Sequence, residues 1–88
     1  MIPDEPGKYE VYIEGPTTAH PYDVLNYKIY NISGGQWAIN SDKVKIKVIS
    51  ETSTAITIEI VSGKSGEFDL SYHLGNVDRT YHVTVLSL

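Results

Sequence analysis

The feature that most constrains this chain is an alternation of apolar and polar residues that returns in segment after segment. In KVKIKVIS (residues 43–50), lysines alternate with valine, isoleucine and valine. A two-residue period is typical of a β-strand that buries one face. The same period predicts a short strand at residues 36–40 and five longer ones. These are residues 8–14, 24–31, 55–61, 67–74 and 80–88.

Turn-forming residues separate the predicted strands and indicate the fold class. Clusters of glycine, proline, asparagine, aspartate and serine recur about every ten residues, a spacing typical of all-β sandwiches. No window carries apolar residues at helical spacing over about three turns. We therefore predict an all-β fold, an antiparallel β-sandwich of about seven strands. The shared phase of the alternation predicts a core around Trp37 that also holds Tyr27, Ile46, Ile58, Leu70 and Val83.

Length and composition narrow the class of protein. The 88 residues are expected to form a single domain, residues 1–88, with an ordinary globular composition of 41% hydrophobic and 20% charged residues. The absence of cysteine excludes disulfides, thiolate chemistry and cysteine-ligated metals. A net charge of −4 argues against a nucleic-acid partner. No apolar run reaches the roughly 18 residues needed for membrane insertion, and the first ten residues lack the apolar stretch of a signal peptide.

Residues 61–68, VSGKSGEF, contain the Gly-Lys-Ser triplet of a phosphate-binding loop. Such a loop also requires a glycine five residues before Gly63, where this chain has Ile58, and it opens a helix whose amides bind the phosphate. An alternating strand follows the triplet instead. We therefore expect no nucleotide cofactor. The segment is interpreted as a turn between two paired strands, residues 55–61 and 67–74, whose register it sets.

Several segments together resemble immunoglobulin-like and PKD-like modules of bacterial or phage proteins. IEGPTTAHPYDVLNYKIYN (residues 13–31) is similar to their opening strands, and GGQWAIN (residues 34–40) to the short strand that bears their core tryptophan. AITIEIVSGKSGEFDLSYHL (residues 55–74) is similar to their paired strands across a glycine-rich turn, and a Val-x-Val strand follows. Two family features are missing: the disulfide of antibody-type domains, and a Trp-Asp-x-Gly-Asp stretch at Trp37.

The resemblance implies that the predicted antiparallel β-sandwich of about seven strands is immunoglobulin-like. It also implies a module that spaces, stiffens or adheres and that is not an enzyme. Such modules occur in tandem in secreted, cell-surface and phage structural proteins, so we expect this domain to be excised from a larger extracellular or cell-envelope protein. Its partners would be neighbouring domains, with carbohydrate or another surface protein as further candidates, and the isolated module would be a monomer. The residues agree that catalysis is not expected, because no Gly-x-Ser-x-Gly nucleophile motif is present.

Three tyrosines are candidate contact residues. Tyr12 and Tyr30 fall on the polar phase of their predicted strands, and Tyr22 lies in a predicted loop. Exposed tyrosines stack on sugars or anchor protein partners, because they offer a large contact area at low entropy cost. The alternative function is therefore a carbohydrate-binding module.

A second candidate surface is basic. Lys43, Lys45 and Lys47 form a positive stripe on one face of a predicted strand. Such a stripe is typical of an edge strand that is guarded against pairing with another sheet. The alternative is a contact for an acidic partner or a polysaccharide.

No metal site is predicted from the sequence. The histidines His20, His73 and His82 form no His-x-His or i, i+4 pair, and no Asp-x-Asp-x-Asp-Gly calcium loop is present. His73 and His82 fall opposite the apolar residues of their strands, so we expect both to be exposed and to be neighbours if the strands pair.

The interpretation of residues 61–68 as a turn is tested by Lys64→Ala. A solvated loop lysine contributes little, so the free energy of unfolding should change by no more than about 0.5 kcal/mol. Millimolar Mg-ATP should leave the melting temperature of the wild-type protein unchanged, as measured by thermal denaturation. An upward shift with Mg-ATP that disappears in Lys64→Ala would contradict this interpretation.

Overall fold

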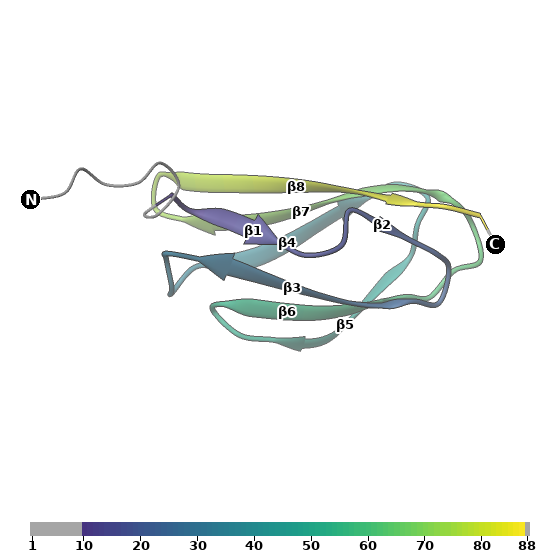
Figure 1. The fold of residues 1–88 in the computed structure, drawn as a ribbon, viewed down its shortest axis with the longest axis horizontal. Helices are drawn as coiled ribbons and strands as arrows, with labels where there is room; N and C mark the ends of the chain where they lie inside the picture. Colours follow the sequence, from purple (N-terminus) through teal and green to yellow (C-terminus); the bar gives the residue numbers. More distant parts are fainter. Residues whose placement is uncertain (1–9, 88) are drawn as a thin grey trace, which may run out of the picture.

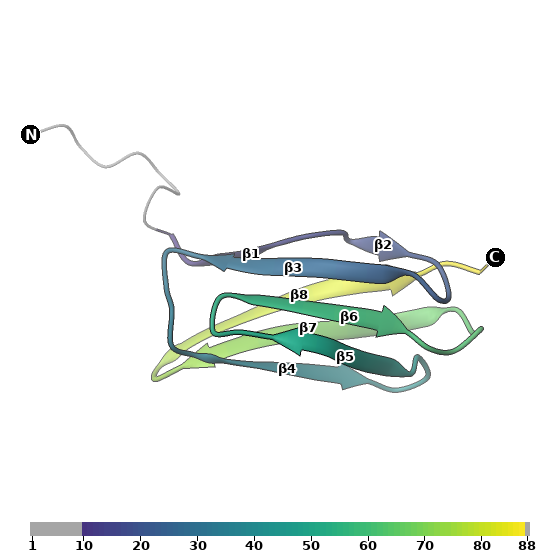
Figure 2. The same cartoon turned by 90° about the horizontal axis from the view of Figure 1, so that it is seen from below.

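The computed structural model describes residues 10–87, which form two four-stranded β-sheets packed face to face (Figures 1 and 2). The predicted all-β sandwich is confirmed. The described residues contain no helix, so none of them provides an apolar helix long enough to cross a membrane. The strands are β1 (Tyr12–Glu14), β2 (Thr18–Ala19), β3 (Val24–Tyr30), β4 (Gln36–Ser41), β5 (Ile46–Glu51), β6 (Ala55–Ile60), β7 (Gly66–Leu74) and β8 (Val77–Val85).

The strand order is β1-β3-β6-β5 in the first sheet and β2-β8-β7-β4 in the second. There are eight strands rather than seven, because the short β2 forms within a segment that the sequence predicted as a loop. Neighbouring strands are antiparallel except β2, which runs parallel to β8. The first two residues of the strand predicted at 8–14 lie outside the described residues.

The chain changes sheets between β1 and β2, at Gly15 and Pro16. A β-carbon on Gly15 would lie 2.3 Å from the ring of Tyr27, so only glycine fits at this crossing. Beyond it, the Thr17 carbonyl accepts a hydrogen bond from the Thr84 N–H at 2.9 Å, which attaches the chain to β8. The close approach therefore lets one extended segment serve as an edge strand of both sheets.

The turn at residues 62–65 joins strands of different sheets, so the predicted pairing of the strands on either side of it is wrong. β6 pairs with β3 and β5, whereas β7 pairs with β4 and β8. The alternation in the sequence shows that each strand buries one face. Strands of both sheets bury that face in the same core, so they have the same pattern. The alternation therefore does not distinguish two paired strands from two strands that face each other across the core.

The longest ladder is the β7–β8 hairpin, which pairs Gly66 with Val85 at one end and Leu74 with Val77 at the other. Its loop has two residues, Gly75 and Asn76, and Gly75 has a φ of +61°. Glycine at the first loop position is the choice of a type II′ hairpin turn, whose twist matches that of the strands. The tight turn explains why β8 begins before the predicted residue 80.

β5 begins later than predicted, at Ile46 instead of residue 43. Val44 is buried and Ile46 is half-buried, but Val48 is 44% exposed, so the expectation of three equivalent inward side chains is wrong. β5 is the edge strand of its sheet, and a bulge interrupts its pairing after Val48. An inward-facing side chain at a sheet edge has no neighbouring strand to cover it.

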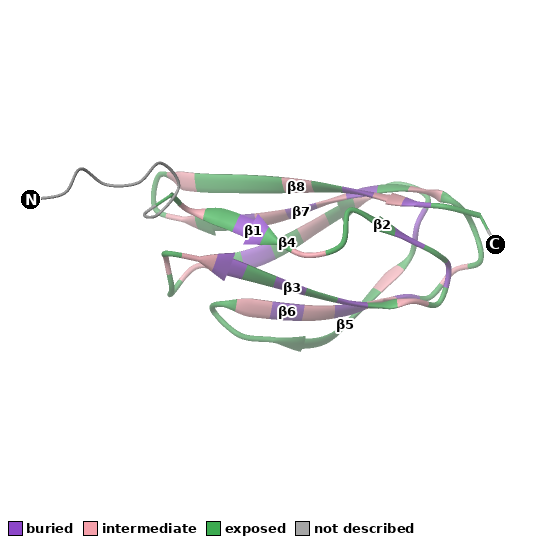
Figure 3. Ribbon diagram, in the orientation of Figure 1, coloured by how far each residue is buried: buried purple, intermediate pink, exposed green. Residues whose placement is uncertain are grey.

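The core lies between the two sheets and consists of apolar side chains (Figure 3). Trp37 is 8% exposed, so its predicted burial is confirmed, and its ring meets that of Tyr72 edge-on at 5.0 Å. Of the predicted companions, only Ile46 is not fully buried. The buried apolar residues are Ile13, Ala19, Leu25, Tyr27, Ile29, Trp37, Val44, Ile56, Ile58, Ile60, Phe68, Leu70, Tyr72, Val83 and Val85.

Trp37 and Tyr72 also fix the loop between β5 and β6. The Trp37 Nε1–H donates to the Thr52 carbonyl at 2.9 Å, and the Tyr72 hydroxyl donates to the Ser53 carbonyl at 2.6 Å. The Tyr72 hydroxyl in turn accepts from the Gly35 N–H at 2.7 Å. Two core rings thus hold two loops closed over one end of the sandwich.

Removing the indole should destabilise the fold strongly. Trp37→Ala is expected to lower the free energy of unfolding by about 3–5 kcal/mol, because a large cavity forms in the core. Trp37→Phe keeps an aromatic ring and loses the bond to Thr52, so its cost should be nearer about 1–2 kcal/mol. Urea denaturation of both variants measures the difference. Equal losses in the two variants, or a loss near zero in Trp37→Ala, would contradict this account of the core.

Candidate functional site

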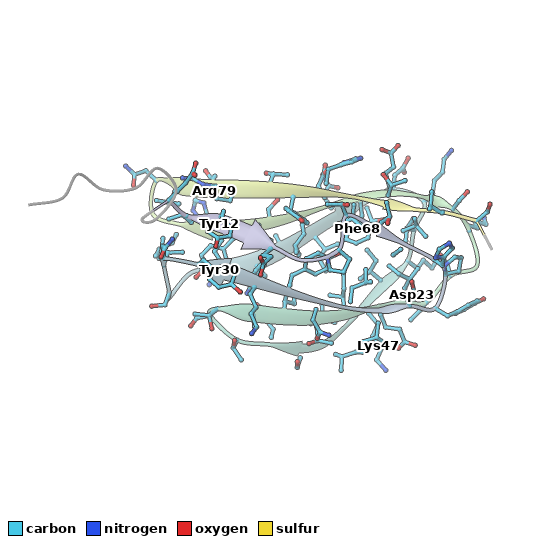
Figure 4. The ribbon with its side chains drawn as sticks, viewed as in Figure 1. Tyr12, Asp23, Tyr30, Lys47, Phe68 and Arg79 are labelled. Carbon is cyan, nitrogen blue, oxygen red and sulfur yellow. The ribbon has the colours of Figure 1, made fainter. Side chains whose placement is uncertain are left out.

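The first candidate surface is an aromatic pair on the outer face of the first sheet. Tyr12 on β1 and Tyr30 on β3 are register partners, and their rings stack at 5.0 Å with an interplanar angle of 19° (Figure 4). Tyr12 is 41% exposed and Tyr30 is half-buried. The Tyr30 hydroxyl donates to the Glu14 carboxylate at 3.0 Å, and this hydrogen bond is the main reason that the pKa of Tyr30 is raised.

Tyr22 lies at the other end of the sandwich, in the turn between β2 and β3. It is 60% exposed and has a φ of +71°, a left-handed conformation that costs a residue with a β-carbon about 1–2 kcal/mol. The turn is closed by a hydrogen bond from the Asp23 N–H to the His20 carbonyl at 3.1 Å. The Asp23 carboxylate also accepts from the His20 N–H at 2.8 Å.

The three tyrosines therefore do not form one row. β3 runs from Val24, next to the Tyr22 turn, to Tyr30, beside Tyr12, so the length of that strand separates Tyr22 from the pair. An aromatic surface on this module is limited to the two stacked rings of Tyr12 and Tyr30, or to Tyr22 alone.

The three lysines are all exposed, but they occupy two places rather than one stripe. Lys47 lies in β5, and Lys45 continues the same edge, since its carbonyl accepts from the Val61 N–H at 2.9 Å. Lys43 instead lines a shallow depression of about 290 Å³ with Asp42, Gly66 and Glu67. No carboxylate of the described chain lies within 4.0 Å of the ammonium group of any of the three lysines.

A charged cluster on the outer face of the second sheet was not predicted from the sequence. The two ring nitrogens of His82 lie 2.8 Å from the Asp69 carboxylate and 2.5 Å from the Glu67 carboxylate (Nδ1 and Nε2, respectively). Asp69 and His82 are register partners on β7 and β8. Alternation places these residues on polar faces, but only the cross-strand register brings the acids to the imidazole.

His73 makes a separate contact with Asp78 at the hairpin end of the same ladder. The prediction that His73 and His82 are exposed on paired strands is confirmed. Each histidine faces an acid rather than the other histidine, because the register pairs His73 with Asp78 and His82 with Asp69. Within residues 10–87, no group of three histidine, cysteine or acidic side chains has the geometry to hold a metal ion.

The His82 cluster defines what this surface can do chemically. Only the protonated imidazolium donates from both ring nitrogens, so it alone satisfies both carboxylates at once. The hydrogen bonds to Asp69 and then to Glu67 accordingly raise the pKa of His82 above its ordinary value of 6.5. The cluster is a charge-dependent clamp between β7 and β8 on the protein surface.

The fold and these surfaces define a β-sandwich whose core is apolar apart from the Trp37 N–H and the hydroxyls of Tyr27 and Tyr72, which are hydrogen-bonded to backbone carbonyls. Within the described chain, no charged side chain is buried. Comparisons of the chain with models of known families, with characterised proteins and with solved structures found no significant match.

The His82 clamp predicts a specific pH dependence of stability. The pKa is higher in the folded state, so the stabilisation is complete below the unfolded pKa near 6.5 and is lost as the pH rises through the folded value. The melting temperature of the wild-type protein should exceed that of His82→Gln by more at pH 6 than at pH 8.5. Titration of the His82 ring protons by NMR measures the folded pKa directly, and a midpoint at or below 6.5 would contradict the prediction.

Proposed function

We propose that this chain is a non-catalytic immunoglobulin-like module of a larger cell-surface, secreted or phage structural protein, in which it spaces and aligns neighbouring domains. The observation that carries the proposal is the path of the chain. β1 begins beside the end of β3, where Tyr12 pairs with Tyr30, and β8 ends at the opposite end of the sandwich, where Val85 pairs with Ala19 (Figure 1). A chain that enters at one end and leaves at the other places successive modules in a line.

The order of the strands supports the immunoglobulin-like part of the proposal. In immunoglobulin-type sandwiches, strands A, B, E and D form one sheet and strands C, F and G the other. The order β1-β3-β6-β5 against β8-β7-β4 matches this arrangement, with β2 as a short addition beside β8. The buried Trp37 lies on β4, the position of strand C, which bears the core tryptophan in those domains.

The side chains support a spacer rather than a catalyst. The charged side chains of the described chain are exposed or half-exposed, and several polar groups bond to one another, as in the His82 clamp and the Tyr30–Glu14 pair. The depression lined by Asp42, Lys43, Gly66 and Glu67 has a volume of about 290 Å³ and is partly open to solvent. Pockets that bind small molecules usually have volumes of about 300–1,000 Å³ and are mostly apolar, so this depression is at the lower limit of that range.

The alternative function, a carbohydrate-binding module, is favoured by one observation. The stacked pair of Tyr12 and Tyr30 presents aromatic area on the outer face of the first sheet, and sugars stack on such rings. Because Tyr22 lies at the other end of the molecule, this surface is small. We therefore rank the spacer function first.

A fusion of two full copies through a short flexible linker tests the spacer function. If the module aligns its neighbours, each copy should unfold at the melting temperature of the single chain. The longest dimension from small-angle X-ray scattering should increase by nearly the length of one module. Copies that lie side by side, or that lose their independent unfolding, would count against the proposal.

Binding of the single chain to a glycan array distinguishes the spacer function from carbohydrate binding. The spacer function predicts no bound glycan. Binding that is lost in Tyr12→Ala and Tyr30→Ala, and retained in the matched control Tyr22→Ala, would replace it with carbohydrate recognition.

A further inference from the structure

β5 is the outermost strand of the first sheet, and one of its backbone edges lies outside that sheet. The Val61 N–H donates to the Lys45 carbonyl, so the backbone groups of Lys45 point toward β6. This direction alternates along an antiparallel strand. The N–H and C=O groups of Ile46 and Val48 therefore point away from β6. The residue opposite Ile46 agrees with this alternation. The Ile60 N–H donates to the Asp23 carbonyl at 2.9 Å, on the β3 side of β6, so it points away from β5.

No hydrogen bond from the described chain reaches the backbone groups of Ile46 and Val48 on this side. β5 and β4 lie along the same margin of the sandwich in Figure 2, and they belong to different sheets. The edge of β5 is thus a row of donors and acceptors that another extended chain could pair with.

Apolar side chains accompany this edge. Ile46 and Val48 face the core side of the sheet, opposite Ile60 and Ile58 in the register, yet Ile46 is half-buried and Val48 is 44% exposed. The next residue, Ile49, lies in the bulge and is 49% exposed. These side chains form an apolar ledge that extends the core beyond the last strand.

Positive charge lies on the other face of the same edge. Lys47 lies opposite Glu59 on the outer face of the first sheet, and Lys45 precedes it by two residues on that face. Figure 4 shows Lys47 at the margin of the molecule. Neither lysine has a carboxylate of the described residues within 4.0 Å, although the chain as a whole carries a net charge of −4.

We propose that the β5 edge binds an extended acidic peptide by strand addition. The backbone of the peptide pairs with the N–H and C=O groups of Ile46 and Val48, which is how extended segments add to an exposed sheet edge. Its inward side chains cover the ledge, and its outward carboxylates meet Lys45 and Lys47. The proposal does not depend on the spacer function.

The register specifies the sequence pattern of the partner. Residues opposite Ile46 and Val48 face the core side, so they are apolar. Residues opposite Lys45 and Lys47 face outward, and directly opposed side chains in a sheet lie about 5 Å apart, within reach of an ion pair. The partner therefore alternates acidic and apolar residues over about five positions, and the bulge after Val48 ends the pairing.

The lysines also disfavour pairing of this edge with a second copy of the same edge. Two copies of β5 brought edge to edge would place lysines against lysines, so the charge that attracts an acidic peptide opposes self-association. An anionic polysaccharide shares the charge of the peptide, but it has no backbone that pairs with Ile46 and Val48 and no apolar face for the ledge. The combination of free backbone groups, ledge and lysines favours the peptide.

The test uses the full chain and the seven-residue peptide TEVEVET with blocked ends. Its two valines are designed to lie opposite Ile46 and Val48. Amide hydrogen exchange, followed by NMR on isotope-labelled protein, should slow at Ile46 and Val48 by about tenfold or more at saturating peptide. N-methylation of the two valines removes the donors that strand addition requires while leaving the charge unchanged, and it should weaken binding by about tenfold or more.

Charge is tested with a matched pair of double variants. Lys45→Glu with Lys47→Glu should weaken peptide binding about tenfold or more, and the remaining binding should depend less on salt. Lys28→Glu with Arg79→Glu changes the net charge equally at exposed positions on β3 and on β8, the latter in the other sheet, so binding should stay within about twofold of the wild type. The basic peptide TKVKVKT should not bind.

Four results would each overturn the proposal. One is no saturable binding of TEVEVET up to millimolar concentration. The second is equal binding of the N-methylated peptide, and the third is protection of amides elsewhere in place of Ile46 and Val48. The fourth is tighter binding of a heparin oligosaccharide than of the peptide at the same lysines, which would assign this edge to polysaccharide.

Discussion

The constraint on which the rest of the structure depends is the burial of one face of every long strand in a single apolar layer. In the described residues, the side chains removed from water are aliphatic or aromatic, and several of the largest are almost inaccessible. Each fully buried large side chain contributes roughly 1.5–3 kcal/mol. A domain of this size buries only about 60–70% of the surface that its unfolded chain exposes, so each such side chain is a large share of a small net stability.

Tyrosines at the ends of this layer connect the core to the loops. The hydroxyl of Tyr27 donates to the Pro16 carbonyl at 2.7 Å, and that of Tyr81 donates to the Gly15 carbonyl at 2.6 Å. The two rings meet edge-on at 5.8 Å. Tyr27 is fully buried and Tyr81 is half-buried, and each hydroxyl reaches a backbone acceptor, so the rings fix the crossing between the sheets without leaving a buried donor unpaired. Burial also raises the pKa of Tyr27, which keeps this hydroxyl a donor.

The two sheets differ in the charged side chains on their outer surfaces. The second sheet presents carboxylates that are already engaged by His82, whereas the first sheet ends in a strand whose lysines lack such partners. Tyr22 is held in a left-handed conformation at the end where β8 leaves the sandwich. Strained exposed residues persist where the surrounding structure holds them, and such positions often serve contacts. A buried core with exposed residues on its edges and turns agrees with the module function proposed above.

The sequence by itself determined the fold class, the burial of Trp37 and the exposure of the strand residues Tyr12, Lys47, His73 and His82, because a two-residue period records which face of each strand meets water. The tertiary structure alone decided which strands pair. It placed β6 and β7 in different sheets, left Val48 uncovered at an edge, separated Tyr22 from the Tyr12–Tyr30 pair and brought Glu67 and Asp69 to His82. Pairing and register depend on contacts between segments far apart in the chain, and one strand's alternation contains no record of its neighbour.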